Sequence, residues 1–136
     1  MGGKHARFSP SAAGRRLNCP PSLVLEEQFQ DEESEYAAEG SAGHALAEHL
    51  IKKHLKQRSK RPTSAYYTEE LLEAVDEYVS FIIGEIEEAK RACGDPVFSV
   101  EQRVDASDYV AECFGTADMV LVTDKVAHII DLKLGQ

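Results

Sequence analysis

The sequence predicts an α+β fold in which N-terminal helices pack on a three-stranded antiparallel meander. Helical patterns with capping residues fill the chain as far as Gly94. From Pro96 onwards, apolar and polar residues tend to alternate with a period of two, as they do in half-buried strands. Two apolar runs near the end, 119–122 and 126–130, flank a short polar connection, which is typical of a β-hairpin.

Two short helices are expected near the N-terminus. Ser9 and the proline after it form an N-cap and a first-turn proline, so the first helix should run from about 10 to 17. The proline-containing segment that follows ends this helix. Ser22 is expected to cap the second helix, over 23–28.

Two long helices are expected to follow. The first should run over 35–57, and its interior residues Gly40 and Gly43 imply that another element packs closely there, since each glycine costs a helix roughly 1 kcal/mol relative to alanine. Thr68 is expected to cap the second helix, which should end near Cys93. The buried stripe of this second helix is expected to consist of Leu72, Val75, Val79, Ile82, Ile83 and Ile86.

The sheet is expected to begin with a strand over 97–104. Its alternation places Phe98, Val100 and Val104 on one face, and Ser99, Glu101 and Arg103 on the other. The second strand is expected to start at Phe114.

The hairpin that follows brings acidic residues together. If Asp124 and Lys125 form a two-residue turn, Asp118 lies directly opposite Asp131. Period-two alternation then places on one face Thr116, Asp118, Val120, Val122, Ala127, Ile129, Asp131 and Lys133. The other face carries Met119, Leu121, Val126, His128, Ile130 and Leu132.

Two facing carboxylates need a compensating charge. Cross-strand Cβ atoms lie roughly 5 Å apart, a separation at which two like charges repel by about 3 kcal/mol at an effective dielectric near 20. A bound Mg²⁺ or Mn²⁺ ion would remove this repulsion, because both ions prefer oxygen ligands. The alternative is that Asp118 and Asp131 are strand-end residues in water, with Lys133 as a solvated partner.

The composition indicates a single globular domain over residues 1–136, since 43% of the residues are apolar and 29% are charged. The three cysteines are far apart and odd in number, which favours a reducing cytoplasm. No apolar run approaches the ~20 residues of a membrane span, and the N-terminus lacks the apolar core of a signal peptide. We therefore expect a cytoplasmic protein that does not associate with membranes.

The charge distribution limits how the chain could contact nucleic acid. A net charge of −9 argues against a protein that binds nucleic acid over its whole surface. A local run without acidic residues contains Lys52, Lys53, Lys56, Arg58, Lys60 and Arg61. This run is either a patch that contacts DNA or the solvated end of a helix.

Several motifs together resemble a known nuclease superfamily. Gly-Thr-Ala-Asp over 115–118 and Ile-Ile-Asp-Leu-Lys over 129–133 resemble motifs II and III of the PD-(D/E)XK nucleases, in their RecB-like exonuclease branch. Upstream, Glu-Gly-Ser-Ala-Gly-His over 39–44 and Glu-Gln-Arg-Val over 101–104 extend the resemblance. It spans nearly the whole chain, which resembles more closely still a phage-associated family of unknown function assigned to that branch.

The resemblance implies a divalent-metal site, in which Mg²⁺ or Mn²⁺ is bound by His44, Asp118, Asp131 and the backbone carbonyl of Leu132. It also implies that Lys133 acts in catalysis together with Asp118 and Asp131. The lysine would orient the attacking water or stabilise developing negative charge as a fixed cation near the metal.

The implied activity is metal-dependent hydrolysis of DNA phosphodiester bonds by a phage exonuclease in the bacterial host cytoplasm, with DNA as the partner. Glu101 is either a further acidic ligand, a partner of Lys133 behind the ligands, or half of a simple cross-strand salt bridge. Two other functions stay open: a catalytically inactive nuclease-fold module for interaction or assembly, and a nucleic-acid-binding domain that does not cleave.

The chain departs from the family pattern at two places. Cys19 stands where some relatives hold the first ligand of an iron–sulfur cluster, but no cysteine triplet follows to complete the thiolate set, so Cys19 is expected to be a small buried residue. Relatives also continue beyond Lys133 into a further helix and further strands. We therefore expect an incomplete, C-terminally truncated restriction-endonuclease-like core, whose exposed edge strand could pair two chains into a homo-oligomer.

Overall fold

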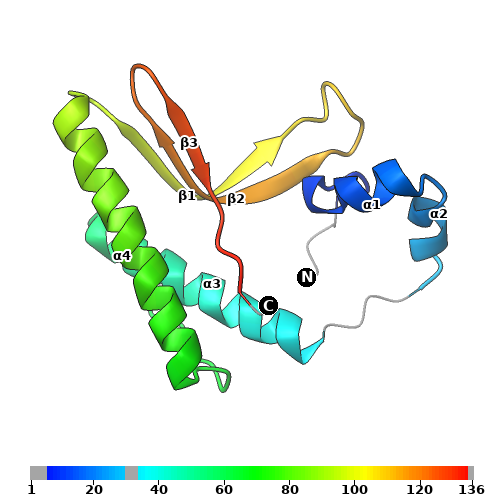
Figure 1. The fold of residues 1–136 in the computed structure, drawn as a ribbon, viewed down its shortest axis with the longest axis horizontal. Helices are drawn as coiled ribbons and strands as arrows, with labels where there is room; N and C mark the ends of the chain where they lie inside the picture. The colour runs from blue at the N-terminus through cyan, green and yellow to red at the C-terminus, as the bar shows by residue number, and fades with distance from the viewer. Residues whose placement is uncertain (1–5, 30–33, 135–136) are drawn as a thin grey trace. The chain divides into compact units, whose positions relative to one another are not determined.

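The computed structural model describes residues 6–29 and 34–134. It has the predicted α+β architecture, with helices first and a three-stranded antiparallel sheet last (Figure 1). Contacts divide the described residues into two compact units, one formed by 6–29 with 103–116 and the other by 34–102 with 117–134. The two units are described separately below.

The first unit contains three short helical segments: the 3₁₀ helix η1 (Pro10–Ala12), α1 (Ala13–Asn18) and α2 (Ser22–Glu26). These agree with the two predicted short helices, except that Ser22 is the first residue of α2 and the N-cap position belongs to Pro21. None of the three segments buries a residue. Cys19 is also exposed, so the prediction that it would be buried was wrong. The reason is that these short helices form no core that could cover its side chain.

Two long helices, α3 (Glu35–His54) and α4 (Glu69–Ala92), cross and pack against each other in the second unit (Figure 1). The Thr68 hydroxyl caps α4, as predicted, by accepting the backbone N–H of Leu71 at 3.2 Å. Helix α3 ends before the predicted position 57, because the backbone adopts a left-handed conformation at Lys56, where φ is 59°.

The core of the second unit lies between these helices and the sheet. The predicted stripe of α4 is confirmed at Val75, Val79, Ile82 and Ile86. It is wrong at Leu72, which is 40% exposed, whereas its neighbour Leu71 is 5% exposed. The difference arises because α4 turns Leu71 toward the facing helix, where it lies beside Gly43.

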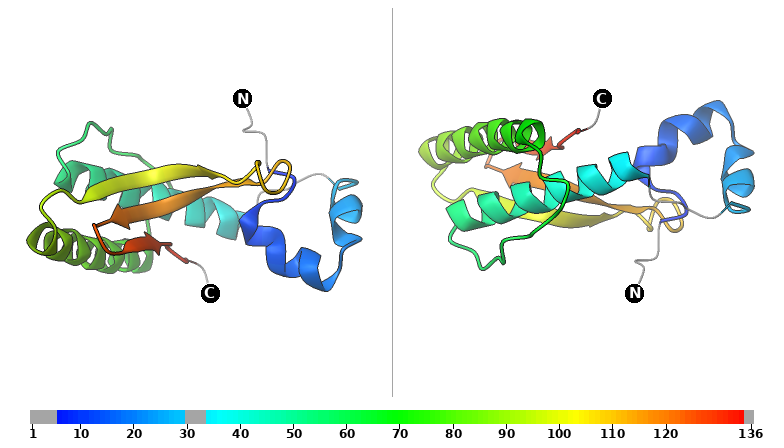
Figure 2. Two further views of the ribbon diagram at one scale, coloured as in Figure 1. Left: turned by 90° about the horizontal axis from the view of Figure 1, so that it is seen from above. Right: turned by 90° about the horizontal axis from the view of Figure 1, so that it is seen from below.

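The sheet consists of β1 (Val97–Asp105), β2 (Phe114–Val122) and β3 (Ala127–Ile130), in that order. Both α3 and α4 lie on one of its faces (Figure 2). The hairpin has the predicted register, with Val122 opposite Ala127 and a two-residue turn that Thr123 and Val126 close through a 2.9 Å hydrogen bond. The predicted division of the hairpin into two faces is confirmed at buried Met119 and Leu121 on the helix side and at exposed Ile129 on the other. It is wrong at Val126, which was predicted for the helix side and is 49% exposed, because it lies beside the hairpin turn.

Two features of the sheet depart from regular alternation. The backbone of Glu101 in β1 has a φ of 53°, and beyond it Val104 is exposed instead of sharing the buried face of Phe98 and Val100. The last strand ends at Ile130, so the pairing predicted for Asp131 lies outside the sheet.

Among the described residues, none of the helices is long and apolar enough to cross a membrane.

Candidate metal centre

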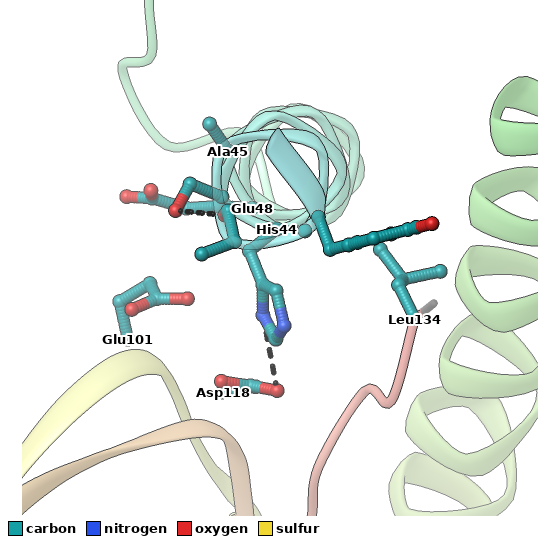
Figure 3. Close-up of a pocket in the computed structure, with 10 residues that line it drawn as sticks. His44, Ala45, Glu48, Glu101, Asp118 and Leu134 are labelled. Carbon is teal, nitrogen blue, oxygen red and sulfur yellow. Dashed lines mark hydrogen bonds and ion pairs between the residues drawn. The ribbon is translucent and has the colours of Figure 1, made fainter. Parts of the chain in front are cut away.

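Three elements of the second unit direct side chains to one point: His44 from α3, Glu101 from β1 and Asp118 from β2. Each offers one ligand atom, and these atoms all lie within 4.8 Å of one another. The imidazole of His44 points from α3 at the carboxylate of Asp118, with the carboxylate of Glu101 beside them (Figure 3). We refer to His44, Glu101 and Asp118 as the metal cluster.

Asp118 is held from two sides. Its Oδ2 atom lies 3.3 Å from Nδ1 of His44, and the same oxygen accepts the backbone N–H of Leu132 at 2.7 Å. The side chain is only 14% exposed, so these contacts largely determine its orientation. The N–H of Leu132 is free to bond to a side chain because β3 ends two residues earlier.

Glu101 occupies a strained and electrostatically unfavourable position. A non-glycine residue with φ near 53° lies in the left-handed region, which costs on the order of 1–3 kcal/mol and is most often found at functional sites. Burial and then the negative charges of Asp118 and Glu48 raise the pKa of Glu101, and His44 partly opposes that increase. A bound cation would compensate for the proximity of two half-buried carboxylates.

An open pocket of about 550 Å³ leads to the metal cluster. Its α3 wall is formed by small residues, among them Ala37, Gly40 and Ser41. Tyr36 and Leu134 also line it. The metal cluster is therefore accessible to a ligand of moderate size from this side.

Asp131 and Lys133, which the sequence analysis placed in the catalytic set, lie in the segment after β3 and form an ion pair with each other. The side chain of Lys133 is 77% exposed, and its hydrogen bond to Asp131 raises the pKa of the ammonium group. The structure therefore brings together His44 and Asp118 of the predicted ligands with Glu101, for which a role as a further acidic ligand was one of the open alternatives. Asp131 lies outside this group. Leu132 contributes its N–H to Asp118 rather than to a strand partner.

The predicted DNA-contacting residues lie at the end of α3 and in the loop that follows. Lys52 is half-buried and pairs with Glu48, one turn from His44 on the same helix. The other five are exposed: Lys53, Lys56, Arg58, Lys60 and Arg61. These five residues form a basic segment that begins in the last turn of α3.

Two residues near the metal cluster escaped the sequence analysis. Glu48 lines the pocket and lies four residues after His44, a spacing that places both on one side of a helix and could have suggested it. Tyr78 of α4 adjoins the metal cluster from the core side. It stands among the apolar residues of α4, so its sequence position is typical of an ordinary core aromatic.

A scan against protein-family models matches residues 5–136 to a family described as "Protein of unknown function (DUF2800)". No solved structure matches the chain significantly.

Proposed function

Because the chain belongs to the DUF2800 family, which is described as being of unknown function, we propose its function from the metal cluster: divalent-metal-dependent hydrolysis of DNA phosphodiester bonds. The observation that carries this proposal is the convergence of three ligand atoms from three elements within 4.8 Å. The sequence motifs that resemble those of RecB-like PD-(D/E)XK nucleases support the same chemistry, and they make an exonuclease of phage origin the form of it that we favour.

The donor set fits a hard divalent cation. Two carboxylates and one imidazole are suitable ligands for Mn²⁺, and Mg²⁺ is bound by carboxylates with water in its remaining positions. Glu101 and Asp118 are partly buried next to each other, so a cation between them would relieve their repulsion. The hydrogen bond from the Leu132 N–H to Asp118 fixes the orientation of that carboxylate.

A divalent cation in such a site lowers the pKa of a bound water and neutralises charge on a phosphate. The chain's own contribution is to hold the cation through His44, Glu101 and Asp118. Lys133 extends into solvent from the segment after β3, where its ammonium could contact a phosphate of a bound strand. Asp131, which pairs with Lys133, orients that ammonium.

The basic segment from Lys53 to Arg61 supports contact with DNA. Its side chains are exposed, and lysine and arginine contribute to affinity by neutralising phosphates. The net charge of −9 restricts such contact to a local patch.

A catalytically inactive module is the second candidate, and one observation favours it. Lys133 and Asp131 pair with each other, and neither is one of the three residues of the metal cluster, whereas catalysis requires their side chains at the reacting phosphate. The same protein could then bind a cation and a partner without cleaving DNA.

Calorimetric titration with Mn²⁺ tests the metal site. We expect wild-type protein to bind Mn²⁺, Asp118→Asn to lose binding, and Asp124→Asn, in the exposed hairpin turn, to bind like wild type. Absence of binding by the wild type would exclude the proposed function.

Cleavage of linear DNA in Mn²⁺ tests the chemistry. We expect the wild type to degrade the DNA and Lys133→Ala to be at least about 100-fold slower, since a residue that stabilises charge in the transition state is worth about that much. Lys125→Ala, in the hairpin turn, is the matched control for loss of an exposed lysine. Metal binding without cleavage would favour the inactive module.

A further inference from the structure

The hydroxyl group of Tyr78 lies in an unusual environment. The side chain projects from α4 toward the metal cluster, and its oxygen is buried without a hydrogen-bond partner among the described residues. A buried hydroxyl with no partner destabilises a fold, and such groups are normally paired with protein or ordered water. The described residues therefore supply no hydrogen-bond partner for the Tyr78 hydroxyl.

A small cavity adjoins this hydroxyl. Its volume is about 10 Å³, and His44, Glu101 and Asp118 line it together with Tyr78. That volume is close to the minimum needed to hold one water molecule, provided that polar partners surround it. The remaining lining consists of Glu48 and of apolar residues, among them Ala47 and Ile51. A water in the cavity would therefore find its polar partners in Tyr78, the metal cluster and Glu48.

We propose that Tyr78 is a positioning residue of the metal centre: its hydroxyl donates a hydrogen bond to one water in this cavity, and that water donates to the carboxylates of Asp118 and Glu101. The inference rests on the proposed metal site and adds a residue of α4 that no motif indicates. The water would occupy the core side of the two carboxylates. Their remaining lone pairs would then face the open pocket, from which a cation enters.

The protonation state of Tyr78 is consistent with a donor. Burial and then the charges of Asp118 and Asp131 raise the pKa of the phenol, so it keeps its proton at neutral pH. Carboxylates can only accept hydrogen bonds, so the direction of donation runs from the phenol through the water to the acids. Partners that orient metal ligands from behind typically change metal affinity 10- to 100-fold when removed.

The chain offers a matched control for this role. Tyr67 also has a buried hydroxyl without a partner among the described residues and also packs on the core. It is not among the described residues that line the cavity or the pocket. Tyr67→Phe and Tyr78→Phe therefore remove the same atom from similar surroundings, and only the second removes it beside the metal cluster.

Titration of the full chain with Mn²⁺ by calorimetry, combined with thermal melts of the metal-free variants, tests the inference. We expect Tyr78→Phe to melt within a few degrees of Tyr67→Phe, because both remove an unpaired buried hydroxyl. We expect Tyr78→Phe to bind Mn²⁺ roughly 10-fold more weakly than wild type, and Tyr67→Phe to bind like wild type.

The alternative outcomes separate the inference from the proposed function. Wild-type affinity in Tyr78→Phe would overturn the role of Tyr78 and leave the metal site intact. Equal weakening in both variants would overturn it as well, because the effect would then come from core packing. No Mn²⁺ binding by the wild type would overturn both proposals. If Tyr78→Phe did not fold, Tyr78→Leu, which lacks both the hydroxyl and the ring, would take its place. Normal Mn²⁺ binding by this variant would refute the inference, and roughly 10-fold weaker binding would support it.

Discussion

Leu134 packs so closely on Gly43 that a Cβ atom added to the glycine would overlap the Leu134 Cδ1 atom. Gly43 precedes the metal-cluster residue His44 on α3, and Leu134 follows Lys133. The contact therefore ties the segment that carries Asp131 and Lys133 to the helix that carries the imidazole. Leu71 of α4 also lies 3.1 Å from the same added atom, so the space is closed from two sides.

The first prediction concerns Gly43→Ala. Alanine gains up to about 1 kcal/mol of helix propensity over glycine, but here its methyl group must displace Leu134, and such overpacking typically costs about 1–3 kcal/mol. Gly40→Ala is the matched control, because a Cβ at Gly40 meets nothing within 4 Å. In urea unfolding, we expect Gly40→Ala to have a higher free energy of unfolding than wild type. We expect the free energy of unfolding of Gly43→Ala to be at least about 1 kcal/mol lower than that of Gly40→Ala. Equal increases in the two variants would contradict the close packing of Leu134 on Gly43.

The second prediction concerns the end of α3. The N–H of Lys56 bonds to the carbonyl of Lys53 at 3.1 Å and the N–H of Gln57 to that of Lys52 at 2.8 Å, the pattern of a Schellman motif with lysine at its left-handed position. Glycine adopts this conformation without a steric cost, so we expect Lys56→Gly to raise the free energy of unfolding by about 1 kcal/mol.

The control for Lys56→Gly is Lys53→Gly, which places the same residue inside the last turn of α3. We expect this variant to lose up to about 1 kcal/mol of stability, as glycine does within a helix. Chemical denaturation measures both. If Lys56→Gly lowered the free energy of unfolding, the lysine side chain would contribute more stability than its left-handed backbone costs.

The third prediction concerns Glu101 and pH. Because the folded-state pKa of this acid is raised above its ordinary value of 4.5, ionisation disfavours the folded state. This loss of folding stability is absent below pH 4.5, grows as the pH rises from 4.5 through the folded-state pKa of Glu101, and is complete above that pKa. In the presence of a chelator, we therefore expect Glu101→Gln to melt above wild type at pH 7, with the difference shrinking toward pH 4.

Thermal melts of Glu88→Gln, at an exposed position on α4, provide the control and should match wild type at both pH values. Glu101→Gln should also bind Mn²⁺ more weakly than wild type, because the neutral amide is a poorer ligand than a carboxylate. A variant that melted below wild type at pH 7 without metal would show that the glutamate is not destabilising.

The fourth prediction concerns stabilisation by metal. A ligand that binds only the folded state adds about 2.7 kcal/mol at a free concentration 100 times its Kd, which is several degrees in Tm for a domain of this size. We expect Mn²⁺ to raise the Tm of wild type in this way and a chelator to reverse the shift. Asp118→Asn should show no shift, whereas Asp131→Asn should retain most of it, since Asp131 lies outside the metal cluster.

The prediction for Asp131 distinguishes the metal cluster in the structure from the ligand set that the resemblance to PD-(D/E)XK nucleases implies, in which Asp131 binds the metal. Loss of the shift in Asp131→Asn would show that Asp131 enters the coordination sphere when metal binds. The segment after β3 would then rearrange around the contact between Gly43 and Leu134.

Local patterns were sufficient for most of the secondary structure. The cap at Thr68, the stripe through Val75 and Ile82, and the turn at Asp124 each depend on residues within one or two turns of each other, so their spacing is visible in the sequence. The pattern failed at Leu72 and Val104, where the choice between buried and exposed depends on a partner element far along the chain.

The amino-acid sequence by itself determined which residue types are available to the site and which strand register Asp118 would have, because alternation and turn length are local properties. Only the tertiary structure decided that Glu101, and not Asp131, joins His44 and Asp118. The physical reason is twofold: the left-handed backbone at Glu101 redirects β1, and β3 ends before Asp131 can pair with Asp118. Neither event has a spacing signal, because alternation and turn length do not show where a strand adopts a left-handed residue or where strand pairing ends.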